Sequence, residues 1–438
     1  MAQEGAGMDR RRINGFIVPP GRFAEEDPAR ILERLQRRAG ANAIAIPCDG
    51  AHLAFRPDLA LYRGLRYAPP THDAAAAARM AALGRAIRAA KAESMTVLLM
   101  LDGAPAGGLQ DEDVARLPDG TAPTLASGGG DDARALASPH LRAIARATAI
   151  DALNAHPQAD GLIAGRSSYP TCTLDPAFLD FGPHARDAAA ALGLDFAAMQ
   201  SAASSLRAHL LGRLTAQDLT MWTERDGGRF RMLQALIEIP ALHDWLSFKA
   251  RLGAGTLAAW RAGLDAAAPG KALVACGPPP PLSTLAGFSF RGAAATCDAV
   301  IAPLRTAQWC AAIRAWGETL AAANPALRAH PALPRTLAAM FDVVDDAGFD
   351  RLEDWRAPAP DEAHPVGQHA QTRKLRNARA EAGERPVWAM AQAAGPLTDF
   401  ARRFAIAWAA APDGAWTEDC DDRDEARLDA IGAIAGVA

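Results

Sequence analysis

The sequence predicts an α/β fold, a (β/α)8 TIM barrel, and three observations carry that prediction. Eight short apolar runs bounded by turn residues occur along the chain, and helical periodicity separates nearly every neighbouring pair. None of the runs alternates polar and apolar residues, so each strand is expected to be buried on both faces, as in a parallel sheet covered by helices. The length of 438 residues suits one barrel domain, 1–438, with enlarged loops.

The expected strands are separated by segments with helix signals. They span 13–18, 43–47, 96–101, 161–164, 271–275, 299–303, 386–390 and 414–416. Asp27 with Pro28, and Ser138 with Pro139, mark two helix starts, because a cap side chain accepts a backbone N–H and proline fits the first helical position. Apolar stripes at helical spacing mark the helices after the last three strands: Trp309, Ile313, Trp316 and Leu320; Leu397, Phe400, Phe404 and Trp408; Leu428, Ile431 and Ala435.

Two connections are too long for plain strand-to-helix units. The first is an excursion over 166–270, after the fourth strand, and the second is a proline-rich insertion over 324–385, after the sixth. Loops that follow the carboxyl ends of the strands build the active site in this fold. The excursion after the fourth strand is therefore the better candidate for a functional segment.

Composition argues against several classes of function. Lys and Arg number 46 and Asp and Glu 50, mixed along the whole chain with a net charge of −4, which argues against nucleic acid or a membrane surface as a partner. Apolar stretches are interrupted well before the roughly 20 residues of a bilayer span, and the first residues lack the apolar core of a secretory signal. We therefore expect a cytoplasmic protein. Its alanine-rich helices, with arginine as the preferred cation, suggest a bacterial source.

No motif in the sequence points to a cofactor or a metal. The six cysteines form no Cys-x-x-Cys pair and no Cys/His ligand spacing, so neither structural zinc nor a disulfide framework is expected. The only glycine run, at 128–130, lacks the Lys-Ser or Lys-Thr of a phosphate-binding loop. Cys48 and Cys276 fall at or just beyond strand ends, where each either lines the barrel mouth or fills the core as a small apolar residue.

Several short segments carry a resemblance to a known family. They are Ile13-Asn14-Gly15-Phe16, Asp160-Gly161-Leu162-Ile163-Ala164, Phe181-Gly182-Pro183-His184-Ala185, Ala191-Leu192-Gly193-Leu194-Asp195, Gly395-Pro396-Leu397-Thr398-Asp399-Phe400, Pro412-Asp413-Gly414-Ala415-Trp416 and Leu428-Asp429-Ala430-Ile431-Gly432. Together they resemble bacterial hypothetical glycosyl hydrolase-like (β/α)8 barrels, relatives of the amylase-type clan. The resemblance implies a carbohydrate site at the carboxyl-end face of the barrel.

The chain departs from that family at the fourth strand. Family members have acidic residues at the end of this strand and then a Cys-Phe-Cys-Pro-His-Cys element, whereas here 165–170 read Gly-Arg-Ser-Ser-Tyr-Pro. Asp180, Gly182 and Ala185 replace the cysteines, so no metal site can be built from those thiols.

Glycosidic hydrolysis usually needs two carboxyl groups, roughly 5 to 10 Å apart. Asp102 directly follows the third strand and is our first candidate, the alternative being a turn-forming Asp-Gly. Glu418 follows the eighth strand and Trp416, an aromatic residue of the kind that sugar sites use as a platform, but acids also gather before a helix for dipole reasons. Glu224 lies in the excursion, where it either reaches the mouth or is merely solvated.

Other residues are predicted to contact the substrate. Asp49 follows the second strand, and Arg166 and Tyr169 stand where the family's acids are expected. The guanidinium of Arg166 favours an anionic group on a ligand or a structural pair with Asp102. His184 and Trp222 complete the set, His184 either as a contact or as a hydrogen-bonded residue that orients others.

These features support a glycoside hydrolase-like protein that acts on or binds a small-molecule or oligosaccharide ligand. If it is an enzyme, Asp102 with Glu418 or Glu224 forms the carboxylate pair. The competing hypothesis is a non-catalytic, carbohydrate-binding or regulatory barrel that has lost the acids after the fourth strand. A lyase or isomerase acting on an anionic sugar is a third possibility, suggested only by Arg166. Nothing in the sequence indicates the oligomeric state.

Overall fold

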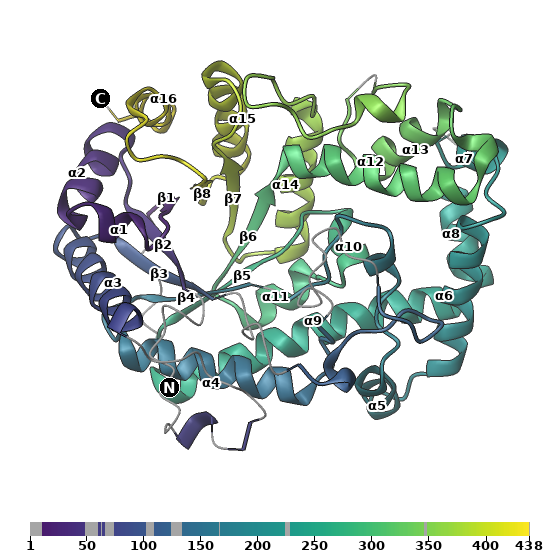
Figure 1. The fold of residues 1–438 in the computed structure, drawn as a ribbon, viewed down its shortest axis with the longest axis horizontal. Helices are drawn as coiled ribbons and strands as arrows, with labels where there is room; N and C mark the ends of the chain where they lie inside the picture. Colours follow the sequence, from purple (N-terminus) through teal and green to yellow (C-terminus); the bar gives the residue numbers. More distant parts are fainter. Residues whose placement is uncertain are drawn as a thin grey trace.

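The computed structural model of the protein describes residues 11–48, 60–62, 64–65, 74–101, 109–123, 134–165, 167–223, 228–345 and 348–437. Eight parallel strands close into one barrel in chain order, which confirms the predicted fold (Figure 1). They are β1 (Ile13–Ile17), β2 (Ala43–Cys48), β3 (Thr96–Leu101), β4 (Gly161–Ala164), β5 (Ala272–Cys276), β6 (Ala299–Leu304), β7 (Val387–Gln392) and β8 (Gly414–Glu418). The sheet has no free edge, because β1 pairs with β8, with Ile13 opposite Gly414.

Helices surround the barrel. They are α1 (Arg22–Glu25), α2 (Pro28–Ala39), α3 (Ala74–Ala92), α4 (Pro139–Ala155), α5 (Pro183–Ala191), α6 (Phe196–Leu210), α7 (Ala216–Thr223), α8 (Gly228–Glu238), α9 (Pro240–Ala267), α10 (Leu282–Ala286), α11 (Phe290–Thr296), α12 (Thr306–Ala323), α13 (Ala332–Met340), α14 (Gln368–Ala382), α15 (Leu397–Ala410) and α16 (Glu425–Ala435). Both start signals are confirmed: Asp27 accepts the Ala29 N–H at the start of α2, and Ser138 accepts the Leu141 N–H at the start of α4.

The long connection between β4 and β5 holds α5 to α9, and the connection between β6 and β7 holds α12 to α14. In Figure 1, α6, α7, α8 and α13 lie at the side of the molecule away from the strands. The long helix α9 packs along α4 and returns the chain to β5, while α13 packs on α7. The two connections therefore build one lobe beside the barrel.

Among the described residues, apolar side chains form two separate cores. One lies between the strands and the helices, and the other fills the barrel itself with Ile13, Ile17, Ala43, Ala45, Leu98, Ile163, Val274, Ala299, Ile301, Trp388, Met390 and Trp416. These residues alternate along each strand, because successive side chains in a strand point to opposite faces. Every strand is thus buried on both sides, as its sequence predicts.

Gly15 allows the barrel core to close. A Cβ atom at this position of β1 would lie 2.4 Å from a ring carbon of Trp416, which is fully buried. We expect Gly15→Val to lower the free energy of unfolding by about 1–3 kcal/mol, because the larger side chain would clash with the buried indole of Trp416. Denaturant unfolding measures this loss. Gly21→Ala is the matched control, since a Cβ there meets nothing within 4 Å; an equal loss in both variants would contradict the packing argument.

A fully buried lysine joins α9 to two connections. The Lys249 ammonium donates to the carbonyl oxygens of Ala177, at 2.6 Å, and of Leu285. It also lies 5.1 Å from the ring centroid of Trp245. Burial lowers the pKa of Lys249 to about 7, although the negative charge of Asp180 opposes this shift.

The buried lysine predicts that stability rises with pH in the alkaline range. Between pH 7 and about 10.5 the unfolded chain binds a proton at Lys249 that the folded chain does not, so unfolding becomes harder as the pH increases. Lys374, whose pKa burial lowers to about 8, acts in the same direction. We expect Lys249→Met to reduce the slope of unfolding free energy against pH by up to about 1.4 kcal/mol per pH unit in this window. Denaturant titrations from pH 7 to 10 measure the slope, and an unchanged slope would contradict the prediction.

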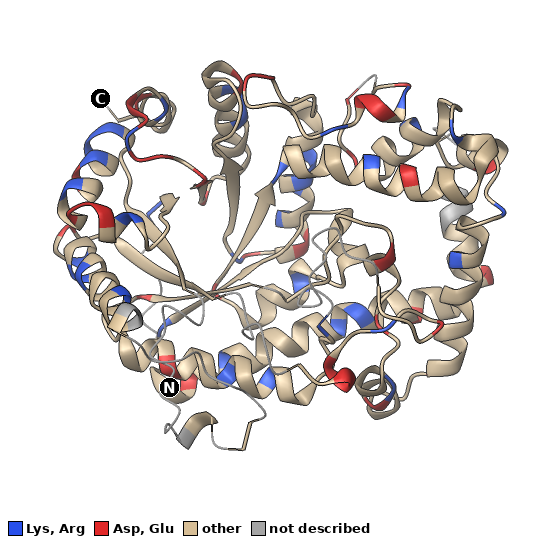
Figure 2. Ribbon diagram, in the orientation of Figure 1, with Lys and Arg blue, Asp and Glu red and all other residues tan. Residues whose placement is uncertain are grey.

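Charges are spread over the outer surface. Figure 2 shows acidic and basic residues interspersed on the helices. Among the described residues, no helix combines the length and apolarity needed to cross a bilayer.

Candidate functional site

Glu418 is the only charged residue within the eight described strands. It is the last residue of β8, and β8 is two residues longer than the sequence predicts. Trp416, two positions earlier, points into the barrel, so Glu418 points to the same side at the carboxyl end. The structure therefore places the Glu418 side chain at the barrel mouth.

Arg305 binds Glu418 at two points. Arg305 directly follows β6, and its Nε and Nη2 atoms donate to the two carboxylate oxygens of Glu418 at 3.1 and 2.7 Å. The side chains are 33% and 17% exposed, so the pair is open to a ligand without being fully solvated. Burial lowers the pKa of Arg305, but Glu418, Cys276 and Asp419 together outweigh burial and leave that pKa above its ordinary value. Arg305 therefore stays positively charged in the site.

Gln392 and Asp419 extend this polar cluster. Gln392 ends β7 and lies opposite Glu418 in the strand register, and its amide donates to the Asp419 carboxylate at 2.9 Å. Asp419 has a φ angle of 59°, a left-handed conformation that aspartate adopts more readily than most residues. We name Arg305, Gln392, Glu418 and Asp419 the polar cluster of the mouth. It can offer hydrogen-bond donors and acceptors to a ligand side by side.

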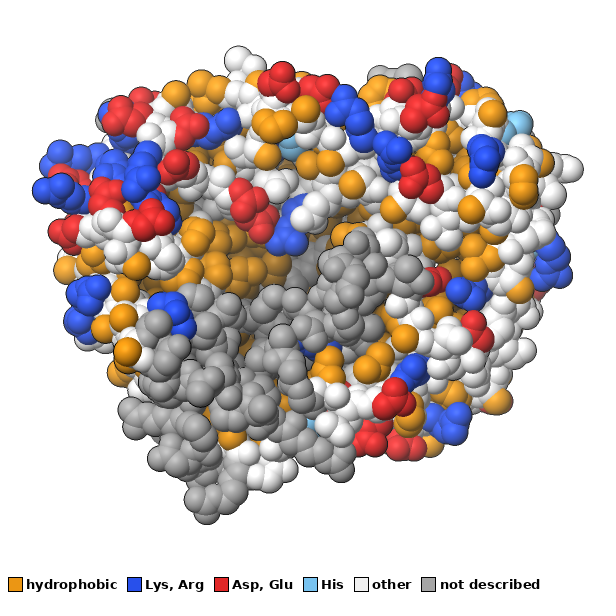
Figure 3. Space-filling model, in the orientation of Figure 1, with side chains coloured by type: hydrophobic (Ala, Val, Ile, Leu, Met, Phe, Trp, Pro, Cys, Tyr) orange, Lys and Arg blue, Asp and Glu red, His pale blue; other side chains and the backbone are white. Residues whose placement is uncertain are grey.

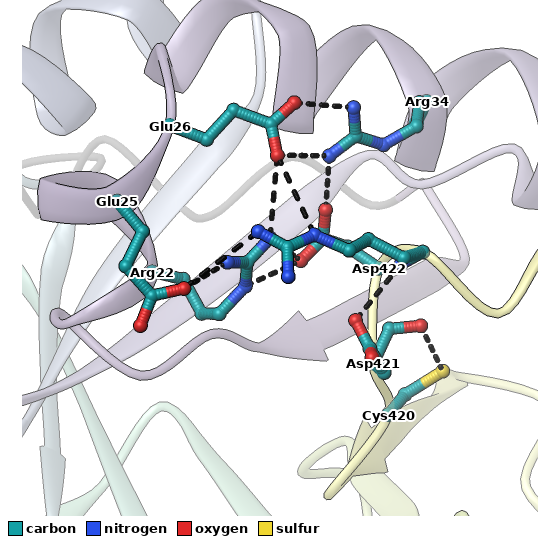
Figure 4. A network of polar contacts seen from close by, with 8 residues as sticks. Arg22, Glu25, Glu26, Arg34, Cys420, Asp421 and Asp422 are labelled. Carbon is teal, nitrogen blue, oxygen red and sulfur yellow. Dashed lines mark hydrogen bonds and ion pairs between the residues drawn. The ribbon is translucent and has the colours of Figure 1, made fainter.

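An ion-pair network fixes the loop that follows Glu418 (Figure 4). Asp422, whose side chain is 5% exposed, binds Arg22 of α1 at 2.8 Å and also Arg34 of α2. Arg34 in turn holds Glu26 at 2.5 Å, and this hydrogen bond lowers the pKa of Glu26 to about 2. The acids before α16 thus have different roles. Glu418 lies at the mouth, whereas Asp422 connects the first and last strand-helix units of the barrel.

Four of the predicted site residues lie outside the described residues: Asp49, Asp102, Arg166 and Glu224. Their roles stay predictions. Of the four that are described, only Glu418 is placed at the mouth by the strand register and the barrel packing.

Tyr169 lies in the interior. Its side chain is 2% exposed, and its hydroxyl donates to Asp180 at 3.1 Å and accepts the Leu136 N–H. Burial raises the pKa of Tyr169 well above its ordinary value, and the Asp180 charge adds to that shift. Tyr169 therefore has a structural role here, because its hydroxyl connects Asp180 in the excursion to Leu136 in the loop before α4.

His184 belongs to a cluster around a buried carboxylate. Its Nε2 atom is 3.4 Å from Asp113, which also accepts a hydrogen bond from Ser138 and lies 3.0 Å from Nδ1 of His140. Trp222 is 36% exposed on α7, which Figure 1 places far from the strands. No described residue joins His184 or Trp222 to the polar cluster.

One expectation about the mouth is wrong, and for Cys48 the structure selects the second of its two alternatives, a small apolar residue in the core. Trp416 is not a platform for sugars, because it is 0% exposed inside the barrel, with its ring centroid 5.8 Å from that of Trp388. Cys48 does not line the mouth, because it packs in the core between strands and helices, whereas Cys276 packs against the barrel core. Both outcomes follow from which side of the strand each residue occupies.

Sequence reasoning missed Arg305 and Gln392. Both stand at the end of a predicted strand or just beyond it, so a survey of all polar residues at strand ends would have found them. The search for carboxylates passed over them. Within the described part of the chain, no group of three His, Cys, Asp or Glu side chains is placed to hold a metal ion.

No known protein family and no curated protein matches this sequence. Its fold is similar to that of the β-galactosidase from the psychrophilic Marinomonas ef1, with 12% identity and a TM-score of 0.52 over 97% of this chain and 59% of that one. It is also similar to the polyextremophilic β-galactosidase from the Antarctic haloarchaeon Halorubrum lacusprofundi, with 14% identity and a TM-score of 0.52 over 97% of this chain and 58% of that one. The chain therefore spans less than three fifths of either enzyme, and the likeness shows that it shares their (β/α)8 barrel fold.

Proposed function

We propose that this protein binds a carbohydrate at the carboxyl-end face of its barrel, as a glycoside hydrolase-like protein. The observation that carries the proposal is the polar cluster, in which the only charge on the described strands meets a guanidinium at the mouth. A planar guanidinium and a carboxylate held side by side can hydrogen-bond neighbouring hydroxyl groups of a sugar. The fold neighbours are β-galactosidases, so a β-galactoside is the first ligand to test.

In the hydrolytic form of this proposal, Glu418 is one of two carboxyl groups. Asp102 or Glu224 supplies the second, and Asp49 and Arg166 contact the substrate. One carboxyl group protonates the leaving oxygen, and the other acts as nucleophile or as base toward water. The variants Asp102→Asn and Glu224→Gln show which residue is the second carboxyl group. Only the replacement of that residue should abolish turnover.

A non-catalytic barrel is the second candidate. Both oxygens of Glu418 already contact Arg305, and β4 leads into Gly165 rather than into an acid. A carboxylate whose two oxygens both accept hydrogen bonds from a guanidinium can orient a ligand. To act as a nucleophile, it must first break one of these hydrogen bonds. The two observations favour binding without hydrolysis.

Calorimetry against a panel of glycosides, paired with a hydrolysis assay on nitrophenyl glycosides, tests both forms. Binding with release of nitrophenol supports the hydrolase, and binding without release supports the non-catalytic barrel. If no glycoside of the panel binds, the proposed function is wrong.

A further inference from the structure

The start of α12 is held by a residue from another segment. Arg305 is the N-cap residue of this helix, and its side chain makes no capping hydrogen bond. Thr306, the first residue of α12, is 0% exposed, and its hydroxyl oxygen lies 2.5 Å from Nδ1 of His364. His364 belongs to the connection between β6 and β7 that also builds the lateral lobe beside the barrel. A side chain 58 positions further along the chain therefore anchors the start of α12.

The same histidine connects to the end of β7. Its backbone N–H donates to the Asp399 carboxylate at 3.2 Å, and this carboxylate accepts a hydrogen bond from Nε of Arg403 at 2.8 Å. Arg403 donates in turn to the backbone carbonyl oxygen of Gln392 at 2.7 Å. His364, Asp399 and Arg403 are at most 6% exposed, so water competes little with their hydrogen bonds. The network thus joins the start of α12 to the end of β7, beside two members of the polar cluster.

His364 is uncharged at neutral pH. Burial lowers its pKa to about 4, the charge of Arg403 adds to that shift, and the charge of Asp399 opposes it. A neutral imidazole carries one donor and one acceptor nitrogen, so Nδ1 can share a hydrogen bond with the Thr306 hydroxyl in either direction. The contact therefore needs no protonation step at neutral pH.

The contact matters for Arg305, because two of its donors must meet the two oxygens of Glu418 at once. Arg305 directly precedes Thr306, so movement at the start of α12 would displace the guanidinium. Figure 3 shows the molecule hollowed near its middle, with acidic and basic side chains next to each other at the edge of the hollow. A loosened pair would offer a ligand no fixed pattern of donors and acceptors.

We propose that His364 is a positioning residue of the polar cluster. It holds the start of α12 through Thr306, and it thereby fixes Arg305 where two of its donors reach Glu418. The inference rests on the proposed function in one respect, since the ligand that benefits is a glycoside. It also gives the connection between β6 and β7 a part in the site.

Exchange of the Arg305 Nε–H proton with water, measured by NMR, tests the proposal without a ligand. Arg305→Lys identifies the signal by its loss. Thr306→Val keeps the shape of the side chain but removes the hydroxyl group, and we expect it to speed this exchange at least about tenfold. Thr306→Ser keeps the hydroxyl group and should retain the slow exchange.

The Arg261 Nε–H is the reference in the same samples. It donates to Asp265 at 2.9 Å within α9, and the Arg261 side chain is 20% exposed. A variant that merely lost stability would speed both exchanges. Thermal unfolding confirms that each variant is folded. An unchanged Arg305 exchange rate in folded Thr306→Val, or an equal change at Arg261, would overturn the proposal.

Variants of the histidine test the same contact from the other side. His364→Leu should speed the Arg305 exchange as Thr306→Val does. His364→Asn, which keeps a hydrogen-bonding group close to the position of Nδ1, should restore most of the protection. The double variant Thr306→Val/His364→Leu should show no further change, because both substitutions remove one shared contact. Fully additive effects would mean that the two residues act separately, against the proposal.

Calorimetry with methyl β-D-galactoside then links the contact to binding. We expect Thr306→Val to weaken binding at least about threefold, and Thr306→Ser to retain most of the affinity. Unchanged affinity in Thr306→Val would overturn the inference and leave the proposed function standing. If the unchanged protein binds no glycoside, the proposed function is wrong, and the exchange rates alone decide whether His364 positions Arg305.

Discussion

Asp399→Ala is expected to lower the free energy of unfolding by about 3–5 kcal/mol, because it leaves a buried guanidinium without its counter-charge. Asp399 and Arg403 lie one turn apart in α15, are 6% and 2% exposed, and meet at 2.8 Å. Arg403 also donates to the carbonyl oxygens of Gln392 and Ala394. The ion pair therefore supports the segment in which β7 ends at the mouth.

The pH dependence of this pair has a defined sign. Burial raises the pKa of Asp399, but hydrogen bonds from Arg402 and Arg403 outweigh burial and leave that pKa below its ordinary value of 3.8. The stabilisation is thus fully present above pH 3.8 and is lost as the pH falls through the lower pKa of the folded state. Urea unfolding at neutral pH measures the full effect.

Arg402→Ala is the control for this prediction. Arg402 also binds Asp399, at 2.7 Å, but its side chain is 41% exposed, so its loss should cost only about 0–1 kcal/mol. If Asp399→Ala lowered the free energy of unfolding no more than Arg402→Ala, the prediction that the buried Asp399–Arg403 pair stabilises the fold would be wrong.

Glu418→Gln is expected to weaken glycoside binding by about 10-fold or more. The substitution keeps the shape of the side chain but removes the charge that Arg305 binds, and a hydrogen bond to a charged group contributes about 1.5–3 kcal/mol. If the protein hydrolyses glycosides, turnover should fall far more than binding, because a catalytic carboxylate acts mainly in the transition state. Calorimetry and the nitrophenyl assay measure the two effects.

Glu425→Gln is the matched control for Glu418→Gln. Glu425 lies in α16, is 60% exposed and binds Arg38 at 2.7 Å, away from the strands. We expect this variant to bind glycosides like the unchanged protein. Equal affinity of Glu418→Gln and the unchanged protein would remove Glu418 from the site.

The fold could be predicted because its signals are local. A buried parallel strand appears as an uninterrupted apolar run, and a helix start appears as a cap followed by proline, as at Asp27 and Ser138. Strand ends were less certain. The apolar run of β8 stops at Trp416, but Thr417 and Glu418 continue the pairing with β7.

The site could be predicted only in part, because it depends on distant pairs. Arg305, just after β6, and Glu418, at the end of β8, bind each other although 113 positions separate them in the sequence. No local pattern around either residue indicates its partner. Tyr169 shows the opposite failure. Its position after β4 suggested a ligand contact, but its ring is buried, and its hydroxyl donates a hydrogen bond to Asp180.

A crystal structure of the complex with a β-galactoside tests the central claim most directly. We predict that the sugar lies at the carboxyl-end mouth, with its hydroxyl groups within hydrogen-bond distance of Arg305, Gln392 or Glu418. A sugar bound in the lateral lobe, or on the outer surface of the helices, would contradict the claim.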